Sequence, residues 1–171
     1  CWGGYGFSSR GDFGIEMGKL TSELNRFGVK WCLRPYDRIK ELDLEAIFDK
    51  SKDWRQYEMP NLLDLMGSYT PATKLIELYF PTIFRCSRFL DDRLPGRADP
   101  SVMTLAVMVF IHEMGHAIDH AKAYGNKTLF STTPEQEEAS AQWFTWQVIQ
   151  NHAPRARMVF EELEKHQPEV Y

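Results

Sequence analysis

The stretch that most constrains the fold is residues 101–124, SVMTLAVMVFIHEMGHAIDHAKAY, which predict one long helix. Asp99 and Pro100 precede it and are typical of a helix start, because Asp accepts hydrogen bonds from the first N–H groups and Pro fits the first turn. Gly125 follows and is typical of a helix end. The apolar part, residues 102–111, is too short to span a bilayer, which takes roughly twenty residues. We therefore expect a helix buried in a globular core and no membrane segment.

His112, Glu113 and His116 in this helix match the pattern His-Glu-x-x-His. Residues four apart lie on one helix face about 6 Å apart, so two imidazoles can bind a single zinc ion. Glu113 projects beside the metal, where its carboxylate can act as the catalytic base and take a proton from water. Apolar residues occupy the histidine face one to two turns upstream, namely Leu105, Met108 and Val109. The alternative is a buried pair of hydrogen-bonded histidines without a metal.

A third protein ligand is needed, because catalytic zinc usually has three and keeps one position open. A metzincin would have a histidine at position 122, where this chain has Lys122, so that class is excluded. His120 lies about 12 Å from His112 along the helix axis, too far to share the ion, and is expected at the rim of the site. The next predicted helix supplies acids as better candidates. These are Glu135, Glu137 and Glu138, and residue spacing favours Glu138 only slightly.

The remaining segments predict a mixture of strands and helices around the motif. Strands are predicted at 29–33 and 73–80, and helices at 81–90, 133–152 and 155–166. The helix at 133 begins with Thr-Pro-Glu-Gln, which is typical of a capping box. The first third of the chain is less regular, with short helical patterns at 15–27, 42–48 and 61–66. The aromatic-rich segment 143–146 and Met103 are expected to pack in the core.

Composition and charge fit one globular domain of 171 residues. Apolar residues make up 43% and charged residues 26%, which is an ordinary balance. The net charge of −4 argues against a nucleic-acid-binding protein, which usually carries a basic surface. Cys1, Cys32 and Cys86 form no CxxC pair, and the first residues show no signal-peptide pattern. These features predict a cytoplasmic location.

The motif and the predicted helix after it resemble the ImmA/IrrE-like zinc metallopeptidases. Residues 112–120, HEMGHAIDH, match the family pattern HExGHxxxH. Residues 138–149, EASAQWFTWQVI, match the pattern Glu-x-x-Ala-Asn-x-Phe-Ala-x-x-Leu-Leu, except that Gln142 replaces Asn and Thr145 replaces Ala. The Met-Pro ending that is common after the second helix of the family is absent from this chain.

The resemblance implies a fold, a metal and a substrate class. The fold is a single zincin-like domain of the α+β class, mainly helical, with a small sheet packed beside the motif helix. It would comprise an N-terminal portion (1–70), a catalytic core (71–152) and a C-terminal helix (153–171). The matched pattern places the third Zn²⁺ ligand on Glu138. Some members of the family cleave a repressor, which implies a protein or peptide substrate for this chain.

Further roles follow if the site is a peptidase centre. Asp119 and Gln142 are predicted to orient the ligand imidazoles. The substrate peptide is expected to pair with an edge strand near residues 74–80. The donor that stabilises the oxyanion is not assigned, and the candidates are Tyr69, Tyr79 and Tyr171.

Two other functions remain open. One is a catalytically inactive zinc-binding interaction domain, although a pure binding domain has no need of a base at Glu113. The other is a DNA-associated zinc protease, in which a basic cluster would contact nucleic acid, against the acidic net charge of the chain. The cluster comprises Arg85, Arg88, Arg93 and Arg97.

Overall fold

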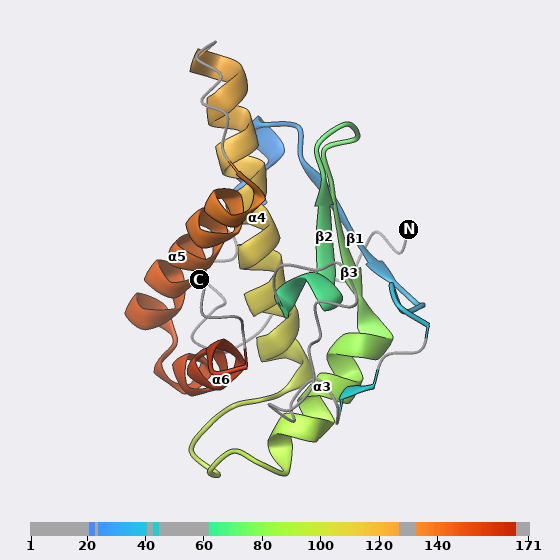
Figure 1. Ribbon diagram of the computed structural model, residues 1–171, viewed down its shortest axis with the longest axis vertical. Coiled ribbons are helices and arrows are strands. Elements are labelled where there is room, and N and C mark those ends of the chain that lie inside the picture. The colour runs from blue at the N-terminus through green and yellow to red at the C-terminus, as the bar shows by residue number, and fades with distance from the viewer. Residues whose placement is uncertain (1–20, 23, 41–42, 45–61, 127–132, 167–171) are drawn as a thin grey trace.

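The computed structural model describes residues 21–22, 24–40, 43–44, 62–126 and 133–166. Within them, the elements are β1 (Lys30–Arg34), the short 3-10 helix η2 (Leu63–Leu65), β2 (Gly67–Thr70), β3 (Leu75–Tyr79), α3 (Phe80–Asp91), α4 (Val102–Asn126), α5 (Pro134–His152) and α6 (Pro154–Glu164). Helices dominate, and the strands form one small sheet beside α4 (Figure 1). The expected α+β architecture, mainly helical with a small sheet beside the motif helix, is confirmed.

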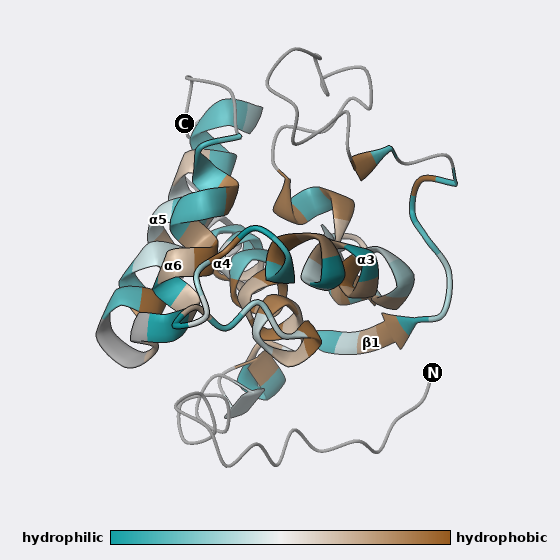
Figure 2. Ribbon diagram, turned by 90° about the horizontal axis from the view of Figure 1, so that it is seen from below, coloured by the Kyte–Doolittle hydropathy of each residue, from teal (hydrophilic) through white to brown (hydrophobic). Residues whose placement is uncertain are grey.

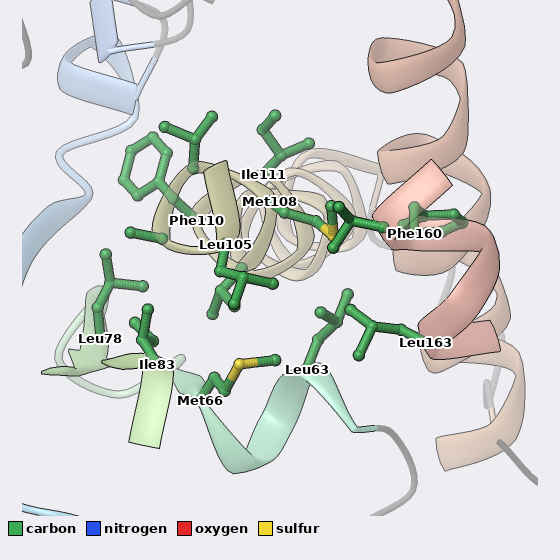
Figure 3. Packing of buried hydrophobic residues seen from close by; sticks show 14 of the residues in the cluster. Leu63, Met66, Leu78, Ile83, Leu105, Met108, Phe110, Ile111, Phe160 and Leu163 are labelled. Atoms are coloured by element: carbon green, nitrogen blue, oxygen red, sulfur yellow. The ribbon is translucent and has the colours of Figure 1, made fainter. Parts of the chain in front are cut away.

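Helix α4 lies at the centre of the molecule, with α5 and α6 on one side and the sheet and α3 on the other (Figure 1). Apolar residues gather on α4 and on the segments that face it, whereas hydrophilic residues are frequent on α5 and α6 (Figure 2). Side chains from every layer meet α4 in the core, among them Leu63, Met66, Leu78, Ile83, Phe160 and Leu163 (Figure 3). Burying this apolar surface is the main stabilising contribution to the fold.

The motif helix is also the most apolar helix of the described chain. Its segment Val102–Lys122 is long and apolar enough to cross a membrane by length and composition alone. However, 72% of its most apolar window is buried inside the fold, as in the core helix of a soluble protein.

The three strands form a mixed sheet in the order β1-β3-β2. β3 pairs in parallel with β1 and antiparallel with β2, so both of its edges are occupied. The expectation that a peptide pairs with the strand near residues 74–80 is therefore wrong for this sheet. That strand is the central one, and its backbone N–H and C=O groups are already used on both sides.

Most predicted helices and strands lie within two residues of the observed ones. The capping box of α5 is present: Gln136 N donates to Thr133 Oγ1, and Thr133 N donates to Gln136 Oε1. Two core assignments are wrong, because the side chains of Trp143 and Met103 are 63% and 44% exposed. The helical pattern at 42–48 lies mostly outside the described residues.

The segment before β3 differs most from its prediction. Instead of a helix over 61–66, the chain forms only the three residues of η2 and then the strand β2, which was not predicted. In the sequence alone, Gly67 and Ser68 are typical of a turn. In the structure, Gly67 lies where β2 crosses α4. A Cβ atom there would overlap Val109 of α4, so only glycine permits this close approach.

Candidate metal centre

Close packing of α4 against α5 places an acid opposite the two histidines of the motif. A Cβ atom at Gly115 would lie 2.9 Å from Ala141 Cα in α5, nearer than real side chains approach a backbone. Glycine at this position therefore allows the two helix backbones to approach each other. Ala141 lies one turn after Glu138, so the same contact brings Glu138 beside His112 and His116. The glycine inside the motif thus has a structural reason.

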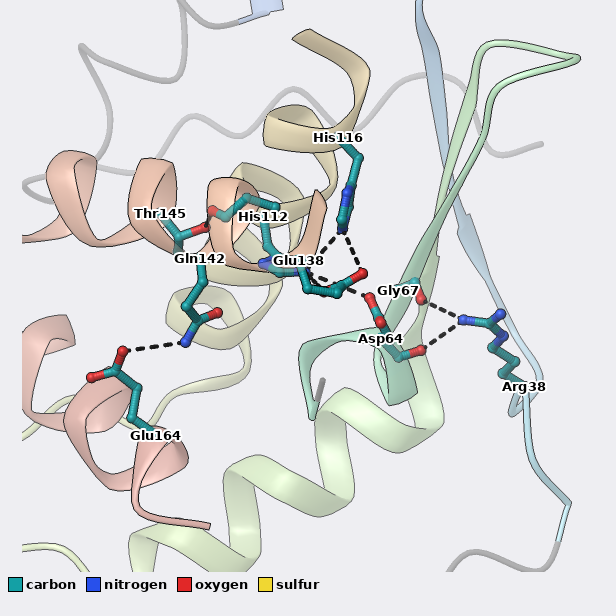
Figure 4. A network of polar contacts seen from close by, with 10 residues as sticks. Arg38, Asp64, Gly67, His112, His116, Glu138, Gln142, Thr145 and Glu164 are labelled. Atoms are coloured by element: carbon teal, nitrogen blue, oxygen red, sulfur yellow. Dashed lines mark hydrogen bonds and ion pairs between the residues drawn. The ribbon is translucent and has the colours of Figure 1, made fainter. Parts of the chain in front are cut away.

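Four side chains from η2, α4 and α5 meet in one cluster, which we call the metal cluster: Asp64, His112, His116 and Glu138 (Figure 4). Glu138 Oε2 lies 3.3 Å from His112 Nε2, and Glu138 Oε1 lies 3.3 Å from His116 Nε2. The two Nε2 atoms are 3.2 Å apart, and Asp64 Oδ1 lies 3.5 Å from His112 Nε2. The structure thus brings together the three residues that the sequence analysis assigned to the metal, and adds Asp64.

The spacing of these donor atoms fits a metal ion. Two ligand atoms that each lie about 2.0–2.1 Å from a tetrahedral zinc ion are about 3.3 Å from one another. Four contacts in the cluster range from 3.2 to 3.5 Å, close to that value, and all of its donor atoms lie within 4.8 Å of one another. Imidazole nitrogens and carboxylate oxygens are both donors that zinc accepts. The cluster could therefore hold a metal ion, although these donors alone do not select one metal.

Asp64 is the member of the cluster that sequence reasoning missed. It contributes from η2, in the portion of the chain assigned to the N-terminal region, 48 positions before His112. A signal was present, because Asp64 is the one charged residue in the run Leu62-Leu63-Asp64-Leu65-Met66. A single acid in a run of apolar residues that pack in the core needs a charged or hydrogen-bonding partner there, since burying an unpaired carboxylate is costly.

Several buried polar atoms at this site lack a hydrogen-bond partner. Glu113 is 1% exposed, and its Oε1 atom, like Glu138 Oε2 and His112 Nδ1, has no such partner in the part of the chain that the structure describes. A Cβ atom at Gly67 would lie 3.0 Å from Glu113 Oε1, so this carboxylate lies against β2. Orphaned carboxylate oxygens in a buried site suit a bound cation, which would compensate their charge.

The metal cluster perturbs the acid–base behaviour of its members. Burial raises the pKa of Glu113 well above its ordinary value, and the nearby Asp64 carboxylate adds to the increase. Burial opposes the charged form of His112, but its contacts with Asp64 and Glu138 outweigh this and raise the pKa to about 10. Burial and His112 lower the pKa of His116. Without metal, the site therefore holds protons that a metal ion would displace on binding.

Glu135 and Glu137 lie outside the metal cluster, whereas the orienting role of Asp119 and Gln142 stays a prediction. Glu135 and Glu137 are exposed on the first turn of α5, which leaves Glu138 as the buried acid of the three. Asp119 accepts hydrogen bonds from Ser140 Oγ and Lys122 Nζ, and so links α4 to α5. Gln142 Nε2 donates to Glu164 Oε1 at 3.4 Å, in α6 (Figure 4). None of these hydrogen bonds involves an imidazole of the metal cluster.

The candidate oxyanion donors also have partners. Tyr69 Oη lies 2.9 Å from Nδ1 of His120, one turn beyond His116 on α4. Tyr79 Oη lies 3.0 Å from Ser68 Oγ, within the sheet. Tyr171 lies outside the described residues.

No protein-family model, curated protein or solved structure matches the chain. The function must therefore be argued from the geometry and chemistry of the site.

Proposed function

We propose that the protein is a zinc-dependent endopeptidase in which His112, His116 and Glu138 hold the metal and Glu113 is the general base. The observation that carries the proposal is the environment of Glu113. Its side chain is buried beside the metal cluster, and Oε1 accepts no hydrogen bond within the described part of the chain. Such a carboxylate costs free energy in a folded protein, so a chemical role is the best reason for its presence.

The residues of the site would divide the reaction between them. A zinc ion in the cluster would supply Lewis acidity, which polarises a peptide carbonyl and makes a water molecule easier to deprotonate. Glu113 would accept the proton of that water and deliver it to the nitrogen of the leaving amine. Burial and the Asp64 carboxylate raise the pKa of Glu113, which makes its carboxylate a stronger base than that of an exposed glutamate.

The motif resemblance extends the proposal to its substrate, and the cysteine pattern to its location. Some ImmA/IrrE-like peptidases cleave a repressor, so we propose a protein substrate such as a repressor. The cysteines without a CxxC pair favour the cytoplasm as its location. A DNA-associated protease has less support, because two arginines of the basic cluster, Arg85 and Arg93, have intramolecular partners. Arg85 contacts Asp37 at 3.0 Å, and the guanidinium of Arg93 lies 3.4 Å from the centre of the Phe89 ring.

One observation favours a second candidate, a catalytically inactive zinc-binding interaction domain. The metal cluster contains four side chains rather than three. Zinc sites with four protein ligands are usually structural, whereas catalytic sites keep one position open.

Substitution of the proposed base separates these two candidates. Glu113→Gln should bind zinc as the wild type does but lose about 10²- to 10⁴-fold in peptide cleavage, because the amide cannot accept the proton. His116→Ala should lose the metal as well. Glu135→Gln, an exposed acid on α5, serves as the matched control and should change neither. Cleavage by Glu113→Gln at the wild-type rate would reject the assigned base, and a zinc-loaded wild type without peptidase activity would favour the interaction domain.

A further inference from the structure

Asp64 enters the metal cluster from an element that the histidine motif does not include. Its Oδ1 atom lies 3.5 Å from His112 Nε2, on the side where η2 approaches α4 (Figure 4). The residue is 8% exposed, and within the described chain its carboxylate makes an ion pair with His112. The carboxylate of Asp64 therefore faces the imidazole of the site.

The backbone of η2 is held in place around this carboxylate. Leu63 and Leu65 on either side of Asp64 are 0% and 2% exposed, so both are anchored in the core. Arg38 Nη1 donates to the backbone oxygen atoms of Asp64 and Gly67, at 3.0 and 3.3 Å (Figure 4). Arg38 thus joins η2 to the start of β2 and leaves the Asp64 carboxylate for the cluster. A side chain presented in this way is preorganised as a ligand.

We propose that Asp64 is a fourth protein ligand of the metal, which closes the site to other ligands until it is displaced. The inference rests on the proposed function, since it concerns the same metal. Two imidazoles and two carboxylates complete a tetrahedral set, so no position is left for water or a substrate carbonyl while Asp64 is bound. Displacement requires only rotation of the short Asp64 side chain.

The charge of the site changes with the same movement. With Asp64 and Glu138 both bound, two carboxylates balance the two positive charges of a zinc ion. When Asp64 leaves, the centre carries one net positive charge and attracts an incoming anion or carbonyl oxygen more strongly. The form in which Asp64 binds the metal is therefore stable and weakly reactive. The form in which Asp64 has left the metal is the reactive one.

Exogenous-ligand binding tests this inference directly. In the cobalt(II)-loaded protein, azide titration followed by visible absorption reports whether a coordination position is free. Asp64→Ala should bind azide at least about tenfold more tightly than the wild type, and should bind zinc at least about tenfold more weakly. Asp64→Asn keeps the shape of the side chain and should change both affinities in the same direction, so a folding defect in Asp64→Ala does not decide the result. Asp92→Ala, an exposed acid after α3, is the control and should match the wild type.

The outcomes separate this inference from the proposed peptidase. Unchanged azide and zinc affinities in both Asp64 variants would overturn the fourth-ligand role, even if the wild type cleaves peptides. If azide and zinc affinities change as expected, the role of Asp64 stands. In that case, faster cleavage by Asp64→Ala than by the wild type supports the peptidase as well. The absence of cleavage in every variant would then remove the peptidase while leaving the four-ligand metal site.

Discussion

His112 is the residue on which the geometry of the metal cluster depends most. Its Nε2 atom lies within 3.5 Å of a donor atom of each of the other three members, Asp64, His116 and Glu138. In the metal-free protein this position favours the protonated imidazole, because its contacts with Asp64 and Glu138 raise its pKa to about 10 despite burial. Metal and proton therefore compete for the same nitrogen.

The stability of the metal-free protein should consequently decrease as the pH rises. In the unfolded chain His112 loses its proton near its ordinary pKa of 6.5, whereas in the folded chain it keeps the proton up to about pH 10. Between these values the folded state binds more protons, so the free energy of unfolding falls with increasing pH. The raised pKa of Glu113 acts in the same direction. Urea unfolding of EDTA-treated protein at several pH values from 6.5 to 10 would measure this.

The variant His112→Gln isolates the contribution of this residue, because glutamine cannot titrate. Its unfolding free energy should depend less on pH than that of the wild type over the same interval. Stability that rises with pH in the metal-free wild type, or an equal pH dependence in both proteins, would contradict the assignment of the proton to His112.

The sequence predicted the residues of the site to different degrees. His112 and His116 share one helix, so their spacing alone placed them together. The choice of Glu138 over its neighbours depended on which face of α5 meets α4, and residue spacing left it open. Asp64 could not be placed, because its contact with His112 joins segments that are far apart in the sequence and depends on where η2 packs. Local periodicity carries no information on such contacts.

Among the secondary-structure elements, the contact between α4 and α5 controls the site. Each helix carries part of the metal cluster, so the distance between their axes sets the distance from Glu138 to the histidines. The contact is made through Gly115 and Ala141, where the absence of a side chain keeps the backbones close. Long helices with strong end signals, such as α4 and α5, were well predicted. The four-residue strand β2 was not, because its pairing with β3 and its contact with α4 are tertiary features.

Gly115→Ala should therefore weaken metal binding by moving α5 away from α4. Alanine normally gains about 1 kcal/mol over glycine within a helix. Here its Cβ atom would lie 2.9 Å from Ala141 Cα, and a backbone atom cannot move aside as the end of a side chain does. Overpacking of this kind costs about 1–3 kcal/mol, so the clash should equal or exceed the gain. We expect lower zinc affinity, measured by competition with a chromophoric chelator, and no gain in thermal stability.

Gly96→Ala is the matched control for this change, because a Cβ atom at Gly96 would have nothing within 4 Å. It should bind zinc as the wild type does. If Gly115→Ala bound zinc with wild-type affinity and was also more stable, the close approach of α4 and α5 would not be what positions Glu138.

At the scale of the whole molecule, the metal cluster joins segments from separate layers of the fold. Asp64 belongs to η2, the histidines to α4 and Glu138 to α5, and these elements share the hydrophobic core that surrounds α4. A metal ion bound to all of them would exist only in the folded protein. Its binding free energy would therefore add to the stability of the entire cooperative unit, not to one loop.

Zinc should accordingly raise the melting temperature of the wild-type protein in a concentration-dependent way. At a free zinc concentration about 100 times the dissociation constant, the gain is about 2.7 kcal/mol. For a chain of this size, such a gain corresponds to an increase in Tm of about 5–10 °C. The comparison is with His116→Ala, which removes one ligand and should show little or no increase at the same zinc concentration. Equal increases in the two proteins would mean that zinc stabilises the fold from some other place. The absence of any increase in a wild type that binds one equivalent of zinc would mean that the unfolded chain binds the metal as tightly as the folded one.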